Sequence, residues 1–399
     1  MNNTQNNFQR NIIKIYFFKF FVSFSLISGI ITPFFLEWGQ ISLAKVLFIQ
    51  SWFLVWVSVF EIPAGAIADY FGRKNALLFS SSFFIFSYIM LIIYPSFELF
   101  LLGEFVMAFA HALLSGTDDA LIYESLQEQG KEKSSKKIFG HASSFNMIGI
   151  LVGAPIGSIL AHFFGFRLPV ALMIVPYSAA LIIALTLNER HIKKSKEEKS
   201  YKNYFYTLFR GFSLCIKNRA IMSLAFDMII TTSIGFFIVL LYQPLIQKNG
   251  VNVFYFGIIL SALIGLQVII INSYTGLERF LKTKKQLIHL LSFFSGIFFI
   301  GAGTIHSALL SSVCVVIGGA LILSRKPLFI SYINKFSQSE TRSISLSTVS
   351  MLEKLFIVLS SFVVEVIVGI SIQWVFVAFG VIAMLLPFLS FIKDDYLVD

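Results

Sequence analysis

Residues 65–74 read Gly65-Ala-Ile-Ala-Asp69-Tyr-Phe-Gly72-Arg73-Lys74, and a long apolar run lies on either side of them. Glycine permits sharp turns and close helix approach, so Gly65 and Gly72 predict a tight turn between two packed helices. Asp69 lies at the end of the first helix, where it can face the N-terminus of another helix, whose unpaired N–H groups favour an anion. Arg73 and Lys74 place two bases directly after the turn.

The apolar runs continue from Ile12 to Ile392 with short polar breaks. Of the 399 residues, 57% are hydrophobic and 13% are charged, which is atypical of a water-soluble protein. A bilayer core of about 30 Å needs about 20 apolar residues per helix. The sequence therefore predicts an all-α membrane protein with about twelve transmembrane helices in two pseudo-symmetric six-helix bundles. The expected spans are 12–36, 42–68, 76–94, 97–120, 139–164, 168–187, 221–246, 253–276, 286–305, 308–331, 344–369 and 371–392.

The longest polar stretch divides the chain near its midpoint. It predicts an N-terminal bundle over 1–187, a cytoplasmic linker over 188–220 and a C-terminal bundle over 221–399. The first part of the linker, ERHIKKSKEEKS, is a charge run that we expect to be solvated. Its second part mixes aromatic and basic residues and favours an interfacial helix.

The basic residues predict the orientation in the membrane. All but four of the 31 Lys and Arg residues lie on one side of the expected spans; Lys45, Arg167 and Lys248 lie on the other side and Lys354 lies within a span. Because basic residues accumulate on the cytoplasmic side, we expect an inner-membrane protein with both termini in the cytoplasm. The net charge of +10 then reflects orientation and contact with anionic lipid rather than nucleic-acid binding.

The second half of the chain carries a degenerate copy of the loop. A shift of 209 residues, the separation of Asp69 and Glu278, also relates Phe71 to Phe280, Arg73 to Lys282 and Tyr123 to Tyr332. An internal duplication is the simplest explanation.

The fixed positions of residues 65–74 resemble the signature loop of the major facilitator superfamily. This resemblance implies two six-helix bundles that rock about a midplane site and give alternating access. It implies that Asp69 faces the start of the eleventh helix, near Ser343, and that Arg73 pairs with Asp118 or Asp119 to close the cytoplasmic side. The alternative is that these charges only anchor the loop at the lipid headgroups.

Ionisable residues inside spans are costly, by about 2.5–3.5 kcal/mol at a helix centre, so each is a functional candidate. Glu104, His111 and Asp118 recur at sevenfold spacing and are expected on one stripe of the fourth span. Glu104 is a candidate for binding a proton or a cationic substrate, and His111 for relaying the proton. In the alternative, Glu104 is solvated near the outer surface and His111 is a packing residue. Asp118 is assigned to the cytoplasmic closure.

Further charges lie in other spans. Glu61 is a candidate for coupling or gating. In the second bundle, Asp227 and Glu353 are candidates for the proton or substrate path, and Glu353 is expected to pair with another helix rather than with its neighbour Lys354.

Arg325 and Lys326 form a basic pair in the tenth span. We expect their long side chains to reach the cytoplasmic surface. If either side chain faces the cavity instead, it favours an anionic substrate.

The fifth span contains Gly149, Gly153, Pro155 and Gly157. These residues resemble part of the fifth-helix motif of the drug and metabolite:proton antiporter branch, although Ala154 separates Gly153 from Pro155. That branch often carries an Arg in the fourth span where Glu104 stands here. The alternative reading of the glycines is a small-residue stripe for close helix packing.

The predicted function is proton-coupled export of a small amphiphilic drug or metabolite. The alternatives are an importer, symporter or facilitator, of a nutrient or siderophore-like metabolite, and a membrane receptor or scaffold without transport. An enzyme is not expected, because no catalytic motif is present in its proper context. We expect a monomer that contacts membrane lipids and a small-molecule substrate, driven by the proton gradient, with no cofactor and no metal site.

Overall fold

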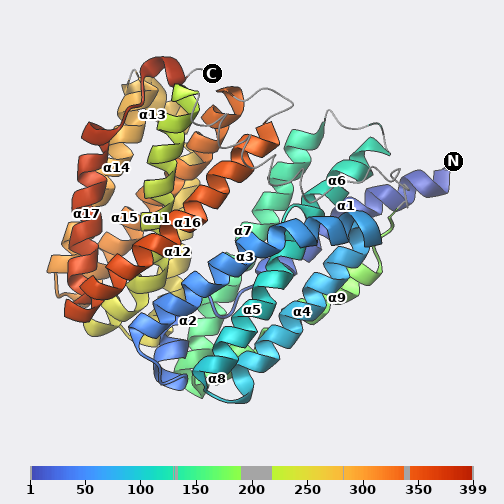
Figure 1. Ribbon diagram of the computed structural model, residues 1–399, viewed down its shortest axis with the longest axis horizontal. Helices are drawn as coiled ribbons and strands as arrows, with labels where there is room; N and C mark the ends of the chain where they lie inside the picture. Colours follow the sequence, from blue (N-terminus) through green and yellow to red (C-terminus); the bar gives the residue numbers. More distant parts are fainter. Residues whose placement is uncertain are drawn as a thin grey trace. The chain divides into compact units, whose positions relative to one another are not determined.

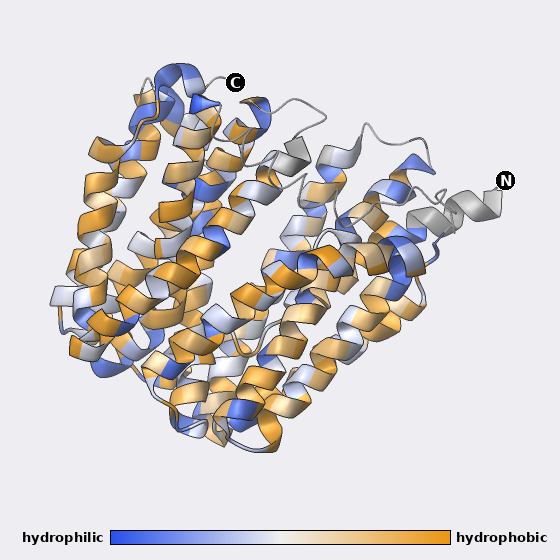
Figure 2. Ribbon diagram, in the orientation of Figure 1, coloured by the Kyte–Doolittle hydropathy of each residue, from blue (hydrophilic) through white to orange (hydrophobic). Residues whose placement is uncertain are grey.

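The computed structural model describes residues 2–128, 130, 134–189, 218–281, 283–336 and 342–397. Within these ranges the regular structure is helical, and no strand is present (Figure 1). Hydrophobic residues fill the middle of most helices, and hydrophilic residues gather at helix ends (Figure 2). The fold class predicted from the sequence is therefore confirmed as an all-helical membrane protein.

The chain forms two compact units. Unit 1 contains Met1–Lys193 and Asn252–Ser261, and unit 2 contains Lys194–Val251 and Ala262–Asp399. The Asn252–Ser261 segment lies on α7 (Ser135–Phe164), where the Ser158 hydroxyl donates to the Phe254 carbonyl at 3.0 Å. Most of the predicted linker, including its expected interfacial helix, falls in 190–217 and lies outside the described residues.

Unit 1 is built from helices that pack in neighbouring pairs. Its buried apolar core includes Phe18, Leu77, Leu121 and Ile122. Serine side chains cap two of the long helices, because Ser42 accepts from the Lys45 N–H and Ser96 from the Leu99 N–H. The elements are α1 (Asn2–Ser23), α2 (Ile31–Pro33), η1 (Phe34–Trp38), α3 (Leu43–Phe71), α4 (Arg73–Ile93), α5 (Phe97–Leu114), α6 (Thr117–Gln127), α7, α8 (Arg167–Leu172), α9 (Ile174–Leu185) and η3 (Val253–Tyr255).

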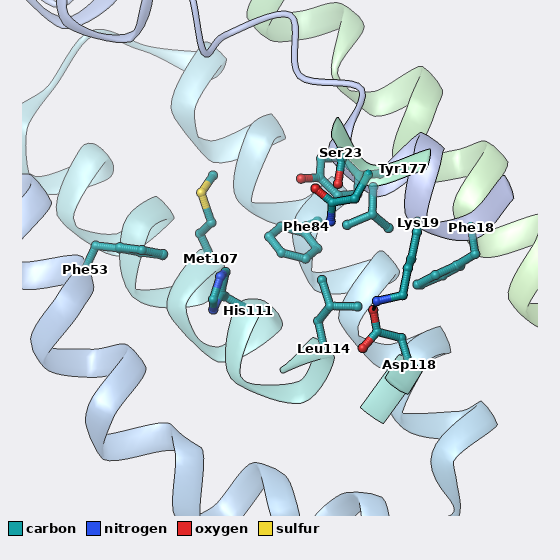
Figure 3. A pocket seen from close by; sticks show the side chains of 12 residues that line it. Phe18, Lys19, Ser23, Phe53, Phe84, Met107, His111, Leu114, Asp118 and Tyr177 are labelled. Carbon is teal, nitrogen blue, oxygen red and sulfur yellow. Dashed lines mark ion pairs between the residues drawn. The ribbon is translucent and has the colours of Figure 1, made fainter. Parts of the chain in front are cut away.

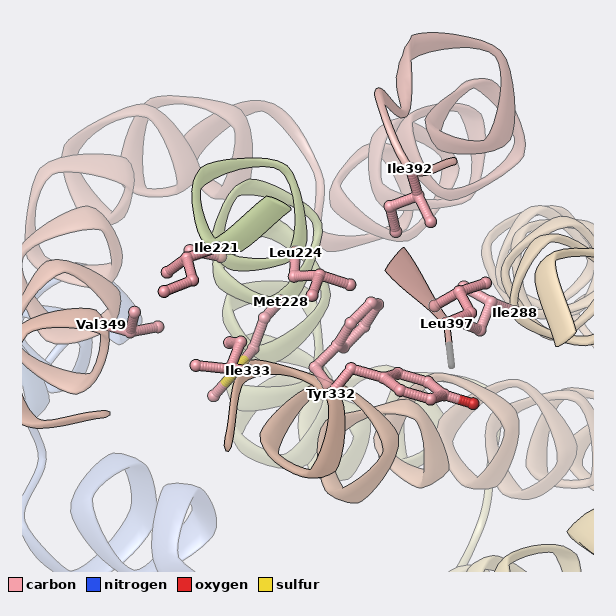
Figure 4. Close-up of a cluster of buried hydrophobic side chains, with 11 residues drawn as sticks. Ile221, Leu224, Met228, Ile288, Tyr332, Ile333, Val349, Ile392 and Leu397 are labelled. Atoms are coloured by element: carbon pink, nitrogen blue, oxygen red, sulfur yellow. The ribbon is translucent and has the colours of Figure 1, made fainter. Parts of the chain in front are cut away.

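Unit 2 has its own core, in which Ile221, Leu224 and Met228 lie close to Tyr332 and Ile333 (Figure 4). The elements are α11 (Arg219–Lys248), α12 (Phe256–Asn272), which begins in unit 1, α13 (Tyr274–Leu281), α14 (Lys284–Thr304), α15 (Ala308–Phe336), α16 (Arg342–Ile370), α17 (Ile372–Leu389) and η4 (Asp394–Tyr396).

Ten helices of the described chain are long and apolar enough to cross a membrane. They correspond to ten of the twelve expected spans; the helices of the first and eleventh expected spans, α1 and α16, are not among them. The expected first span, 12–36, is wrong as a continuous helix, because α1 ends at Ser23 and helical structure resumes at Ile31.

The fourth expected span is also broken. Helix α5 ends at Leu114, and Gly116 takes a positive φ of 74° before α6 begins. Glycine adopts this conformation without the steric penalty of a side chain. Asp118 therefore lies on a new helix, and the expected single stripe of Glu104, His111 and Asp118 is wrong.

Equivalent helices pack together in the two units. Unit 1 pairs α1 with α7, α4 with α5, and α4 with α9; unit 2 pairs α11 with α16, α14 with α15, and α14 with α17. The 209-residue shift carries the start of α4 to position 282, close to Lys284 at the start of α14. This shared pairing supports the internal duplication.

Candidate functional site

A cavity of about 290 Å³ lies inside unit 1 (Figure 3). Helices α1, α3, α4, α5, α6, α7 and α9 contribute its walls. The lining combines aromatic and aliphatic side chains with a few polar ones, the usual composition of a small-molecule site. The lining residues are Phe18, Lys19, Val22, Ser23, Phe53, Phe84, Met107, His111, Leu114, Asp118, Asn146 and Tyr177.

The polar end of this cavity contains an ion-paired cluster. Lys19 Nζ lies 2.5 Å from an oxygen of Asp118 and 2.8 Å from one of Asp119. The side chains of Lys19 and Asp118 are 11% and 12% exposed, whereas that of Asp119 is 55% exposed. Both acids lie in the first turn of α6, where a negative charge is favoured by the free N–H groups.

His111 lies on the cavity wall with Met107 and Phe53 (Figure 3). Its ring meets that of Phe53 edge to face, with the centroids 5.8 Å apart. His111 and Asp118 therefore line one cavity from different helices, whereas the sequence assigned Asp118 to the cytoplasmic closure and only His111 to the proton path.

Glu104 lies outside the lining of the cavity and is buried, with 4% of its surface exposed. The suggestion that it is solvated near the outer surface is therefore wrong. Within the described chain it has neither a hydrogen bond nor an ion pair. The titratable group that interacts with it is Tyr88, which stacks on Tyr177 with ring centroids 5.5 Å apart.

The charged loop between α3 and α4 is organised differently from the prediction. Arg73 Nε donates to Glu124 Oε1 at 2.7 Å, and Arg73 Nη2 lies 4.0 Å from Asp69 Oδ1, whereas Asp118 and Asp119 bind Lys19. The predicted pairing of Arg73 with Asp118 or Asp119 is wrong, because both acids form ion pairs with Lys19 of α1 instead.

The two glycines of the loop have different roles. Gly72 has a φ of 94° and makes the turn, as predicted. Within unit 1, no atom outside the neighbouring backbone of α3 lies within 4 Å of a Cβ placed on Gly65, so Gly65 makes no close approach to another described helix of this unit. The predicted contact of Asp69 with the start of α16 joins the two units and stays a prediction.

Glu189 closes the N-terminus of α4. Its two carboxylate oxygens accept from the Arg73 N–H at 2.6 Å and the Lys74 N–H at 3.0 Å. Gly72 has no side chain that can cap this helix, so a remote carboxylate does so. The expectation that Glu189 belongs to a solvated charge run is therefore wrong.

Unit 2 contains a deeply buried ion pair. Arg325 Nη2 lies 2.6 Å from Asp227 Oδ1, and both side chains are 1% exposed. Arg325 Nη1 donates to the hydroxyls of Thr231 at 2.6 Å and Ser292 at 3.2 Å. The expectation that Arg325 reaches the surface is wrong, because Asp227 and the two hydroxyls hold it inside unit 2.

Lys326 binds a different acid. Its Nζ lies 2.8 Å from Glu353 Oε1 on α16. Glu353 is thus paired with another helix rather than with Lys354, as predicted.

Glu61 is half-buried on α3.

The glycines of α7 pack against the end of the first span. A Cβ added at Gly149 would lie 2.6 Å from the Phe20 carbonyl, one at Gly153 would lie 2.7 Å from the Ser25 nitrogen, and one at Gly157 would overlap the Leu26 carbonyl. Pro155 lies inside the same helix. The packing role of the three glycines is therefore confirmed, and the antiporter assignment stays a prediction.

Several residues of the site are not predicted from the sequence. Lys19 looked like one more basic residue at a cytoplasmic helix end, and Glu124 and Glu189 lay outside the motif. Tyr88 and Tyr177 lie among many aromatic residues. The sequence does carry one signal for Lys19. The 209-residue shift carries Lys19 and Asp118 to positions 228 and 327, close to Asp227 and Arg325, so a pair of opposite charges recurs at nearly equivalent positions of the two halves.

In the described ranges, no group of three or more His, Cys, Asp or Glu residues is arranged to hold a metal ion.

A family model described as Major Facilitator Superfamily matches residues 15–355.

Three transporter crystal structures show the same fold. A mutant of the nucleoside transporter NupG has a TM-score of 0.77 and 13% identity, with 97% of this chain and 100% of that chain covered. A POT family transporter in complex with 5-aminolevulinic acid has a TM-score of 0.75 and 16% identity, with 98% and 97% covered. A D-xylose-proton symporter has a TM-score of 0.72 and 13% identity, with 96% and 97% covered.

Proposed function

Because the chain belongs to the major facilitator superfamily, a family of membrane transporters, we propose that it moves a small amphiphilic molecule by alternating access, coupled to proton movement. The cavity of unit 1 carries this proposal. Its walls contain Phe18, Phe53 and Phe84, which suit an apolar body, and its polar end contains Lys19 and Asp118. A ligand with one apolar and one polar end matches this division.

Export is the proposed direction. It is supported by the resemblance of Gly149, Gly153, Pro155 and Gly157 to the fifth-helix motif of proton antiporters. Import is the alternative, since one structural relative is a D-xylose-proton symporter. The proposed cellular location is the inner membrane, with both termini in the cytoplasm, and the distribution of Lys and Arg supports this orientation.

The cytoplasmic gate of this proposal is the loop of Gly65, Asp69, Gly72, Arg73 and Lys74. The ion pair of Arg73 with Glu124 and the cap from Glu189 hold the loop within unit 1. Asp118 lines the polar end of the cavity, and Asp119 binds the same Lys19; both acids are assigned to the substrate path in place of the gate. His111 shares this path.

Reconstitution into lipid vesicles tests the proposal. Vesicles with an internal pH-sensitive dye and an imposed pH gradient are given a nucleoside, a dipeptide, D-xylose, a siderophore and an amphiphilic dye in turn. Antiport predicts that one compound moves against its gradient while protons move the other way, and that Lys19→Met abolishes this movement. Movement in the same direction as protons supports import. Binding of a compound without transport, in vesicles of intact protein, overturns the proposal.

A further inference from the structure

The polar end of the unit 1 cavity has more negative than positive charge. Lys19 and Asp118 are the charged side chains of the described lining. The Lys19 ammonium lies 2.5 Å from Asp118 and 2.8 Å from Asp119, and a cation this close favours the ionised form of both acids. One cation therefore faces two carboxylates, and the cluster has one negative charge in excess.

The start of α6 reduces this excess without cancelling it. Asp118 and Asp119 lie in the first turn of α6, where the free N–H groups carry about half a positive elementary charge. Within the described chain, Lys19 is the cation that pairs with the two acids. The polar end of the cavity is therefore left with a negative potential.

Asp119 sets the sign of this potential from outside the lining. Its side chain is 55% exposed, whereas those of Lys19 and Asp118 are 11% and 12% exposed and border the cavity. Without Asp119, the charges of Lys19 and Asp118 would cancel. Because Asp119 shares the Lys19 ammonium, the Asp118 carboxylate is only partly neutralised, and it presents the remaining charge to the cavity.

The aromatic walls of the cavity favour a ligand of the opposite sign to Asp118. Phe18, Phe53, Phe84 and Tyr177 belong to the lining. The face of an aromatic ring is negative, so it attracts a cation. In Figure 3, Phe53 lies at the opposite end of the lining from the ion pair, which leaves room between them for the body of a ligand.

From this arrangement we infer that the cavity binds an organic cation, an ammonium compound with an apolar or aromatic body, and that Asp119 determines this charge preference. The ligand ammonium binds the Asp118 carboxylate, and the body lies among the aromatic side chains. Asp119 acts through Lys19 and does not touch the ligand. A cavity of about 290 Å³ is at the small end of ligand pockets, so the body is limited to about one ring and a short chain. The inference rests on the proposed function, because it names the charge of the molecule that the cavity holds.

Equilibrium dialysis of the whole protein in lipid nanodiscs tests the charge preference. Phenylbutylamine, phenylbutanol and phenylbutyrate share one body and are a cation, a neutral molecule and an anion at about pH 8, where an ordinary histidine is neutral. Empty nanodiscs correct for partition into lipid. The wild type should bind the amine at least about ten-fold more tightly than the alcohol, and the anion more weakly than the alcohol. Absence of saturable amine binding, equal binding of the three probes or tighter binding of the anion overturns the inference.

Asp119→Asn tests the role of Asp119. The substitution keeps the size of the side chain, leaves the lining unchanged and makes the cluster neutral. The ratio of amine to alcohol affinity should fall by about ten-fold, while the affinity for the alcohol stays within about two-fold of the wild type. An unchanged ratio, or an equal loss for all three probes, overturns the role of Asp119.

Glu98→Gln is the matched control for Asp119→Asn. It also removes one exposed carboxylate from unit 1, but Glu98 lies in the first turn of α5, about 20 Å along the helix from His111 of the lining. The amine-to-alcohol ratio should stay at the wild-type value, and size-exclusion chromatography checks that both variants fold. A fall in the ratio equal to that in Asp119→Asn overturns the role of Asp119, because any lost acid would then act alike.

The two proposals fail in different ways. Amine binding with the expected preference, in a protein that moves no compound across the membrane, overturns the proposed function and leaves the cation site intact. Transport of a neutral or anionic compound, with no preference for the amine in the binding assay, overturns the cation site and leaves the function intact.

Discussion

The two units place an ion pair at equivalent positions with the charges exchanged. In unit 1 the base, Lys19, is on the first helix and the acid, Asp118, follows the fourth span; in unit 2 the acid, Asp227, is on the first helix and the base, Arg325, is on the equivalent of the fourth. The unit 1 pair lines a cavity, whereas the unit 2 pair is almost fully buried among hydroxyl groups. The same bridge between helices thus borders a cavity in one unit and is buried in the core of the other.

The two units also differ in the glycines that let α7 and its equivalent, α16, approach neighbouring backbone. Gly149, Gly153 and Gly157 of α7 press on the backbone of the first span. The 209-residue shift carries them to Val358, Phe362 and Val366 of α16, of which Phe362 and Val366 are exposed. Close backbone packing therefore involves α7 in unit 1 but not its counterpart α16 in unit 2, where it occurs instead between α14 and α17, at Gly296 and Gly380.

The largest expected effect separates the two ion pairs. Arg325→Met leaves the Asp227 carboxylate buried without a partner, at a cost of about 3–5 kcal/mol. Lys19→Met should cost less stability, because Asp118 borders a cavity and Asp119 is exposed. Thermal unfolding of both variants in detergent measures the difference.

A double variant serves as the control for this experiment. Asp227→Leu combined with Arg325→Met removes both charges and should recover most of the lost stability, since apolar replacement of a whole buried pair is often neutral. Equal losses in Lys19→Met and Arg325→Met would show that the two pairs have the same role.

The next effect concerns the glycines. Gly157→Ala should destabilise by about 1–3 kcal/mol, because the new methyl group overlaps the Leu26 carbonyl and a backbone must move. Gly140→Ala on the same helix meets no atom within 4 Å and is the matched control. In unit 2, Val366→Ala should change stability by less than about 0.5 kcal/mol. A melting temperature for Gly157→Ala equal to that of Gly140→Ala would contradict the packing role.

The sequence was sufficient for the features that depend on composition and period. Long apolar runs predicted the helices, and the 65–74 motif predicted the turn at Gly72, because membrane spans and positive-φ turns leave local signals. Ion-pair partners were not predictable in the same way. Arg73 had several acids within reach, and only packing of α1 against α6 decides that Asp118 binds Lys19.

Burial was equally hidden in the sequence. A long cation near a helix end normally extends to the surface, and Arg325 does not, because Asp227 lies on the facing helix. The break at Gly116 was missed since a single Gly inside an apolar run is also common within membrane helices.

A smaller effect compares the caps of equivalent helices. In unit 1 the N-terminus of α4 is capped by the distant Glu189, whereas in unit 2 that of α14 is capped by the adjacent Thr283. Glu189→Ala and Thr283→Ala should each cost about 0.5–2 kcal/mol. Glu189→Gln should lie between wild type and Glu189→Ala, because one carboxylate oxygen becomes a donor. If the loss in Glu189→Gln equals that in Glu189→Ala, charge rather than acceptor count stabilises this end.

The smallest expected effect compares one partly exposed ion pair from each unit, Arg73–Glu124 in unit 1 and Lys326–Glu353 in unit 2. Arg73 and Glu124 are 20% and 34% exposed, and Lys326 and Glu353 are 42% and 11% exposed. A double-mutant cycle with Gln at both positions should give a coupling of about 0.2–1 kcal/mol for each pair, because solvent screens partly exposed charges. Raising the salt concentration should weaken the Arg73–Glu124 coupling more, since neither of its partners is as buried as Glu353. A coupling at Arg73–Glu124 as large as that at Asp227–Arg325 would mean that unit 1 has its structural ion pair in the gate loop, outside the cavity.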